Sequence, residues 1–181
     1  MKAAPTVIGP KALSNSFLGD LIQVCVVTRD HRRAIEGFVN LGIGPWTIRT
    51  VDTSDPSSLR GIHRGMPADF AAKVCLANSP NMNWEIIEPI RGRSIYTEFL
   101  ERHGDGVQHL AFNCNGADYE ERIRKFHERG YETVQRGVIF GGIDFHYFTA
   151  EDDLHTTIEI WRVPPGFAFP PPQEWVPAPP P

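Results

Sequence analysis

The sequence lacks the features that mark several protein classes. Its cysteines are few and odd in number, and Cys25, Cys75 and Cys114 form no CxxC spacing, which argues against a disulfide framework and a cysteine zinc site. Each lies among apolar residues, so we expect three buried thiols. No stretch approaches the roughly 20 apolar residues of a membrane span, and Pro5 and Gly9 interrupt any signal-peptide core. We therefore expect an intracellular, cytoplasmic protein.

The chain also lacks an excess of basic residues. Lys and Arg number 18 against 22 Asp and Glu, which gives a net charge of −4. This balance provides no electrostatic footprint for nucleic acid or an anionic membrane, and we expect neither as a partner. A hydrophobic content of 41% and a charged content of 22% are typical of a folded globular protein.

Four strand-like segments each carry one metal-capable side chain at a comparable place. Gln23, Glu85, His109 and Glu159 lie among β-branched or aromatic residues, and period-two alternation puts each on one face of its strand. Taken singly, the glutamates are compatible with solvent-facing positions, His109 with a core histidine, and Gln23 with a hydrogen bond to a neighbour. Their matching places in the two halves of the chain favour joint ligation of a metal.

The order of the expected elements repeats along the chain. The first copy has strands at 21–28, 46–51, 71–77 and 83–89, a helix at 31–41, and a Ser-, Pro- and Gly-rich loop at 52–68. After a short helix at 95–102, the second copy has strands at 107–113, 132–137, 143–149 and 156–162, and a helix at 118–129. We interpret this β-α-β-β-β repeat as an ancient duplication.

These patterns predict an α+β fold with two tandem βαβββ modules, eight strands in all, that build one metal site. The expected limits are an N-terminal extension at 1–19, a first module at 20–93, a linker helix and second module at 94–163, and a proline-rich tail at 164–181. Because proline cannot pair in a central strand, we expect the tail to lie on or leave the surface. Its aromatic residues leave open packing against the body or a neighbouring subunit.

One imidazole, two carboxylates and one amide oxygen form a borderline-hard donor set. Such a set suits Zn, Ni, Co, Mn or Fe(II), with one or two positions open for water or substrate. A metal in this place polarises a carbonyl and stabilises the oxygen charge that develops when a neighbouring C–H proton is removed. Glu159 or Glu85 would be the base that takes this proton.

Six segments carry a family resemblance: IQVCVV at 22–27, LGIGPW at 41–46, WEIIEPI at 84–90, EFL at 98–100, GDGVQHLAF at 104–112 and TIEIW at 157–161. Together they resemble the vicinal oxygen chelate superfamily, which includes glyoxalase I, methylmalonyl-CoA epimerase, extradiol dioxygenases and antibiotic-resistance proteins of the bleomycin-resistance type. The resemblance covers about residues 20–163 and implies that the two modules form a curved, mixed, eight-stranded sheet around the metal site. The segments at 84–90 and 104–112 look most like the epimerase and glyoxalase branch.

The resemblance implies a ligand set and a quaternary structure. Gln23 and Glu85 would ligate the metal from the first module, and His109 and Glu159 from the second. Epimerase-like sequences usually have His in the place of Gln23, whereas glyoxalase I can have Gln there. His146 stands at a position that is aromatic in relatives, and it is either an active-site acid or base or an ordinary histidine. Dimers are common in the family, so we expect a homodimer.

These observations favour a metal-dependent isomerase, epimerase or lyase acting on a small-molecule carbonyl substrate, which is bulky or aromatic if several aromatic residues line the cavity. One alternative is a non-catalytic binding or sequestering protein on the same fold. Another is an Fe(II) or Mn ring-cleaving dioxygenase, which is disfavoured because only one of the four positions is a histidine. The loop at 52–70 is either a solvated loop or a lid whose Arg60, His63 and Arg64 meet an anionic group. The sequence leaves the substrate, the metal, the choice of base and the role of the tail in dimerisation open.

Overall fold

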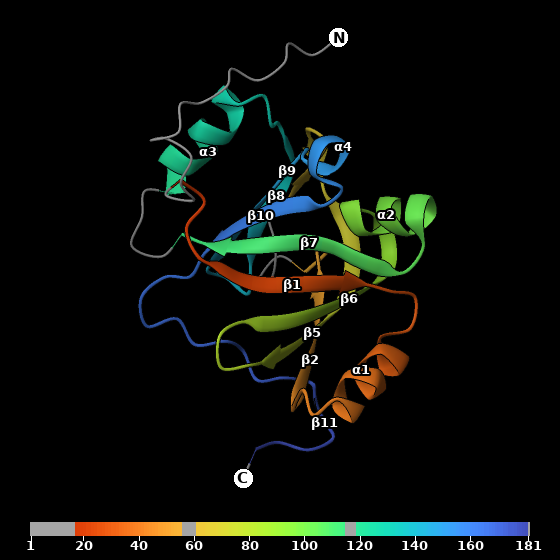
Figure 1. Ribbon diagram of the computed structural model, residues 1–181. Helices are drawn as coiled ribbons and strands as arrows, with labels where there is room; N and C mark the ends of the chain where they lie inside the picture. Colours follow the sequence, from red (N-terminus) through yellow and green to blue (C-terminus); the bar gives the residue numbers. More distant parts are fainter. Residues whose placement is uncertain (1–16, 56–60, 115–118, 181) are drawn as a thin grey trace.

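A single curved sheet organises the chain (Figure 1). The computed structural model describes residues 17–55, 61–114 and 119–180, so the first sixteen residues of the expected N-terminal extension lie outside it. Within these ranges, 11 strands lie in the order β11-β2-β5-β6-β1-β7-β10-β9-β8-β3-β4. The α+β class and the curved mixed sheet are as predicted, with three short strands added to the eight expected.

Two modules of the same topology form this sheet. The first comprises β1 (Leu21–Val27), α1 (His31–Asn40), β2 (Trp46–Asp52), β5 (Asp69–Asn78) and β6 (Asn83–Arg93). After α2 (Ile95–His103), the second comprises β7 (Gly106–Asn113), α3 (Tyr119–Glu128), β8 (Thr133–Ile139), β9 (Ile143–Phe148), the short α4 (Glu151–Leu154) and β10 (Thr157–Arg162). In each module the first strand pairs in parallel with the last. The two first strands, β1 and β7, pair antiparallel at the centre.

Local sequence signals begin the helices that connect these strands. The Asp30 carboxylate accepts a hydrogen bond of 3.0 Å from the backbone N–H of Arg33, which caps α1. Ser94 and Thr97 form a reciprocal capping box at the start of α2. These caps determine the residues at which α1 and α2 begin.

The helices α1 and α3 cover the outer face of the two modules. Under α1, Ile35 packs with Trp46 and Ile86 in one buried cluster. Under α3, the rings of Phe126 and Phe148 stack with centroids 3.8 Å apart. Strand alternation sends the other residues of the same strands to the inner, concave face, where the cavity described below lies.

Two strand additions depart from the expected loop and tail. The hairpin of β3 (Ile62–His63) and β4 (Met66–Pro67) lies in the segment expected to be an irregular loop, and β3 pairs with β8 of the other module. In the proline-rich tail, β11 (Glu174–Val176) pairs antiparallel with the outer strand β2. Both pairings give hydrogen-bond partners to backbone groups that an edge strand would otherwise leave unpaired. Because the paired strands are far apart in sequence, local patterns do not predict these pairings. Among the described residues, no helix combines the length and apolar character that crossing a bilayer requires.

The stacked pair under α3 predicts a large stability effect. Phe126 is only 2% exposed, so Phe126→Ala leaves a cavity and should lower the free energy of unfolding by about 3–5 kcal/mol. Leu41→Ala is the matched control, because Leu41 is 77% exposed and its truncation should change stability by less than about 0.5 kcal/mol. Urea denaturation followed by circular dichroism measures both values. Equal effects of the two substitutions would contradict this packing.

Candidate metal centre

The strand register places the four predicted ligands at equivalent points of the two modules. Gln23 is two residues before the β1 residue that pairs with Glu85. In the same way, His109 is two residues before the β7 residue that pairs with Glu159. Because β1 and β7 are neighbours, the two pairs meet at the centre of the concave face. The symmetry of the fold thus gathers residues that are far apart in sequence.

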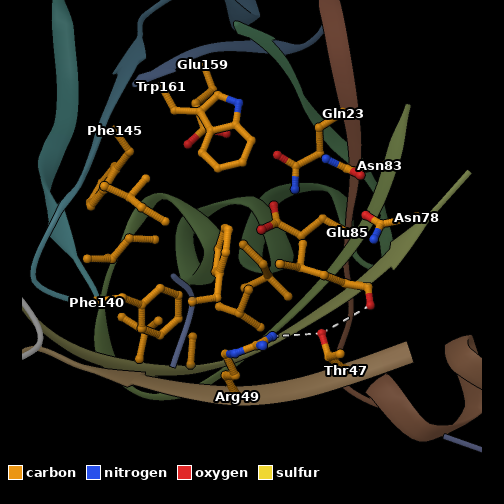
Figure 2. A pocket seen from close by; sticks show the side chains of 18 of the residues that line it. Gln23, Thr47, Arg49, Asn78, Asn83, Glu85, Phe140, Phe145, Glu159 and Trp161 are labelled. Atoms are coloured by element: carbon orange, nitrogen blue, oxygen red, sulfur yellow. Dashed lines mark hydrogen bonds between the residues drawn. The ribbon is translucent and has the colours of Figure 1, made fainter. Parts of the chain in front are cut away.

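The carboxylates of Glu85 and Glu159 both lie next to the imidazole of His109. The Nε2 atom of His109 lies 3.1 Å from Oε2 of Glu85 and 3.1 Å from Oε2 of Glu159. Gln23 lines the same cavity as the two glutamates, and Figure 2 shows the polar ends of these three side chains together at one end of it. All four residues are buried.

A second residue orients the imidazole of His109. The side-chain amide of Gln108 donates to Thr157 Oγ1 at 3.0 Å, which directs Gln108 Oε1 toward the ring. This oxygen lies 2.7 Å from His109 Nδ1, so the network assigns a proton to Nδ1. The lone pair of Nε2 then points at the carboxylates, as in the carboxamide- or carboxylate-held histidines of metal sites.

Two buried atoms in this cluster lack a hydrogen bond. Among the described residues, neither Nε2 of His109 nor Oε2 of Glu85 has a partner of acceptable geometry, although they face each other. Buried polar atoms without partners are rare and costly in folded proteins. A divalent cation between Nε2 and the carboxylates would satisfy them, so the residues present fit a metal.

Electrostatics in this cluster favour a positive charge. Burial lowers the pKa of His109, but the carboxylates of Glu159 and Glu85 outweigh burial and raise it to about 9. Burial raises the pKa of Glu159, and the repulsion from Glu85 adds to that rise. The two carboxylates therefore stabilise a cation at this point, either an imidazolium or a metal ion that displaces its proton.

Sequence reasoning missed Cys25 as a neighbour of the site. Its Sγ and one ligand atom each of Glu85 and His109 lie within 4.8 Å of one another. The available signal was its position two residues after Gln23, on the same face of β1. Burial, followed by the charge of Glu85, raises the pKa of Cys25 well above its usual value, so this thiol stays neutral. All three cysteines are free and buried, as expected.

His146 does not reach this site, and its expected role as acid or base is not retained. On β9, Phe145 and Tyr147 line the cavity, so alternation turns His146 to the outer face. There its ring stacks on Phe148 with centroids 4.8 Å apart, and Nε2 lies 2.6 Å from Thr133 Oγ1. Burial lowers its pKa to about 3, which keeps the ring neutral.

In the described part of the loop at 52–70, the side chains named for the alternative of an anion-binding lid have an acidic partner within the chain. His63 Nε2 and Arg64 contact the carboxylate of Glu98, at 3.1 and 2.7 Å. Burial raises the pKa of Glu98, but these contacts outweigh it and lower the pKa to about 2. The expected role of Arg60 falls outside the described residues.

A large cavity opens from the metal centre. Its volume is about 530 Å³, and its walls come from both modules and from the tail. The apolar part of the wall includes several aromatic residues, namely Phe70, Tyr96, Phe140, Phe145, Tyr147, Trp161, Phe169 and Trp175. Trp46, Trp84, Phe112 and Phe148 pack in the core instead. The aromatic lining fits a bulky, apolar ligand.

Comparison with known families agrees with this architecture. A family model described as the Glyoxalase/Bleomycin resistance protein/Dioxygenase superfamily matches residues 22–149, which is more than half of the chain. The chain belongs to this superfamily. No curated protein matches the sequence.

Several solved structures share the fold of this chain at low sequence identity. A hypothetical protein from Bacillus halodurans has a TM-score of 0.61 and 14% identity, over 82% of this chain and 97% of its own. Methylmalonyl-CoA epimerase from Mycobacterium tuberculosis has a TM-score of 0.57 and 18% identity, over 84% and 93%. A Streptomyces coelicolor methylmalonyl-CoA epimerase in complex with 2-nitronate-propionyl-CoA has a TM-score of 0.55 and 14% identity, over 84% and 99%.

The cluster predicts that each chain binds one divalent cation. His109→Ala removes the only imidazole of the set and should lower the affinity for Zn²⁺, Ni²⁺, Co²⁺ or Mn²⁺ by at least about tenfold to a hundredfold. His127→Ala is the matched control, because His127 lies on the exposed side of α3. Isothermal titration calorimetry of the chelator-treated proteins measures the affinities. Unchanged binding in His109→Ala would contradict the assignment.

The metal-free protein should lose stability at alkaline pH. The folded pKa of His109, about 9, lies above its ordinary value of 6.5, so the folded state binds the proton more tightly than the unfolded state. This stabilisation is complete below about pH 6.5 and is lost as the pH rises through about 9. Urea midpoints in EDTA at both ends of this window should therefore fall further for the wild type than for His109→Gln. Parallel falls would refute the coupling.

Proposed function

We propose that the protein is a divalent-metal-dependent isomerase, epimerase or lyase that removes a proton next to the carbonyl of a small-molecule substrate. The convergence of His109 Nε2 with two carboxylates at 3.1 Å, at the end of an apolar cavity, carries this proposal. Gln23, Glu85, His109 and Glu159 would hold the metal, which we expect to be Zn, Ni, Co, Mn or Fe(II).

The metal, the two glutamates and the apolar walls have different roles in the proposed reaction. When bound, a divalent cation supplies Lewis acidity toward a substrate carbonyl. Glu159 is the favoured base, because its raised pKa makes its carboxylate a better proton acceptor than an exposed glutamate. Glu85 lines the same end of the cavity and is the other candidate for this role. The apolar walls exclude water and so strengthen the electrostatic interactions of both carboxylates.

The comparisons support the class of reaction. Methylmalonyl-CoA epimerases share the fold, and one of them is described in complex with methylmalonyl-CoA. An epimerase of such a compound must remove and return a proton on carbon, which is the chemistry proposed here. For this chain, the aromatic lining of the cavity supports a bulkier acyl or aryl group on the substrate.

A second candidate function is a non-catalytic binding protein on the same fold. The observation that favours it is the aromatic wall to which the tail contributes Phe169 and Trp175, because it encloses a ligand without requiring chemistry. A ring-cleaving dioxygenase has less support, since His109 is the only imidazole in the set. The homodimer remains a prediction; the described tail packs on its own chain through β11 and β2.

Hydrogen exchange at carbon tests the catalytic proposal. In deuterated buffer the metal-loaded protein should catalyse exchange of the α-proton in at least one of methylmalonyl-CoA, a 2-arylpropanoyl thioester and an aromatic α-hydroxy ketone, followed by NMR. Glu159→Gln should slow this exchange by roughly 100-fold or more, because the proton acceptor is lost. His127→Ala should retain full activity.

The outcome separates the two candidate functions. Exchange that depends on the metal, on His109 and on a glutamate supports the enzyme. Stoichiometric binding of the same compounds with no exchange above the buffer rate would reject the enzyme and leave the binding protein.

A further inference from the structure

The cavity contains one buried cation that the proposed chemistry does not use. Arg49 of β2 is only 8% exposed and lines the cavity. Its Nε donates to the carbonyl of Pro170 at 2.9 Å, and one Nη donates to Thr47 Oγ1 at 2.8 Å. Both acceptors are neutral, and no carboxylate among the described residues pairs with Arg49.

This arrangement differs from that of other arginines in the chain. Arg64 pairs with Glu98, and Arg162 pairs with Asp144, each at 2.7 Å. Those two side chains are 52% and 43% exposed, yet they have acidic partners. A buried guanidinium costs free energy unless an anion neutralises it, because arginine does not lose its proton at physiological pH. Burial lowers the pKa of Arg49, in line with this cost.

Residues of the tail hold the guanidinium of Arg49 in place at the wall of the cavity. The tail fixes one side of it through Pro170, and the ring of Phe169 lies 5.7 Å from its central carbon. Among the described residues, none accepts a hydrogen bond from the second Nη group. Figure 2 shows Arg49 on the opposite side of the cavity from Glu85 and Glu159, with apolar side chains between them. A ligand that spans the cavity would therefore meet a cation at one end and the metal centre at the other.

The charge of the wall limits the class of ligand. Among the described residues that line the cavity, Arg49 is the only Lys or Arg. A single planar fork matches the charge and geometry of one carboxylate, whereas a phosphate group would bring a second charge without a second cation. Around Arg49, the lining contains the hydroxyl of Thr47 and the apolar rings of Phe140 and Phe169.

We propose that Arg49 is the anion-binding residue of the cavity and that its ligand is a monocarboxylic acid with a bulky, apolar body. The carboxylate pairs with Arg49, and the body lies against the aromatic wall. The far end of the ligand reaches Glu85, His109 and Glu159, and only this last step rests on the proposed function. Arg49 is thereby a specificity-determining residue that selects acids over their neutral analogues.

Matched acid and amide probes test this inference. The probes are 4-phenylbutanoate and 1-naphthylacetate, each with its primary amide, titrated into EDTA-treated protein so that a bound metal cannot attract the carboxylate. Binding is followed by calorimetry and by the fluorescence of Trp161 and Trp175, which line the cavity. The wild type should bind each acid at least about tenfold more tightly than its amide, since charge-assisted hydrogen bonds are about twice as strong as neutral ones.

Three variants isolate the role of the guanidinium. Arg49→Met should abolish the preference for the acid, and Arg49→Lys should keep a smaller preference because the charge remains without the planar fork. Gln173→Ala removes a contact between the tail and Thr50 but keeps the charge, so it should change acid and amide affinities alike. Circular dichroism checks folding, and Arg49→Lys gives the answer if Arg49→Met does not fold.

The result is independent of the test for catalysis. Acids that bind no better than their amides in the wild type, including acids that do not bind, would overturn the inference. A preference that survives unchanged in Arg49→Met or Arg49→Lys would also overturn it. If the acid preference holds but no α-proton exchanges, the proposed reaction fails alone; if exchange occurs without the preference, only the role of Arg49 fails.

Discussion

The antiparallel pairing of β1 with β7 is the constraint on which the site depends. Each module alone supplies only half of the donor set, and no local segment brings a glutamate of one half to the histidine of the other. The central register places Cys25 opposite His109, which aligns the two parallel pairs β1–β6 and β7–β10 on one face. A shift of one residue in this pairing would turn one half of the ligand set to the outer face. The cluster of candidate metal ligands is therefore a property of the interface between modules.

Burial gives that interface its chemical character. Two buried carboxylates held next to each other are unfavourable unless a positive charge balances them. The protein provides the rest of the arrangement: Gln108 and Thr157 fix the ring of His109, and aromatic side chains shield the cluster. The same burial raises the pKa of Glu159, and the charge of Glu85 adds to that rise. The cost to stability and the shifted pKa thus have one origin.

The sequence predicts the residues of the site only on strands where polar and apolar side chains alternate clearly between the two faces. One polar residue in an apolar strand locates Gln23, Glu85, His109 and Glu159, and the repeated order of elements predicts their grouping. On β9 aromatic residues occupy both faces, so the sequence does not show which face His146 occupies and leaves its role open. The strands β3, β4 and β11 depend on distant partners that no local signal identifies. Gln108 matters through its contacts with Thr157 and His109, the first of which joins two strands and cannot be read from the local sequence.

The tail shows how an extension changes a shared fold. Proline prevents the segment after Val163 from entering the sheet centre, but three residues still pair with the edge strand β2. That pairing carries Phe169 and Trp175 over the cavity and brings the Pro170 carbonyl to Arg49. The tail therefore supplies part of the wall at the end of the cavity remote from the metal centre. In this chain, the tail and β2 together wall one end of the cavity, while Gln23, Glu85 and Glu159 line it from the duplicated strands β1, β6 and β10.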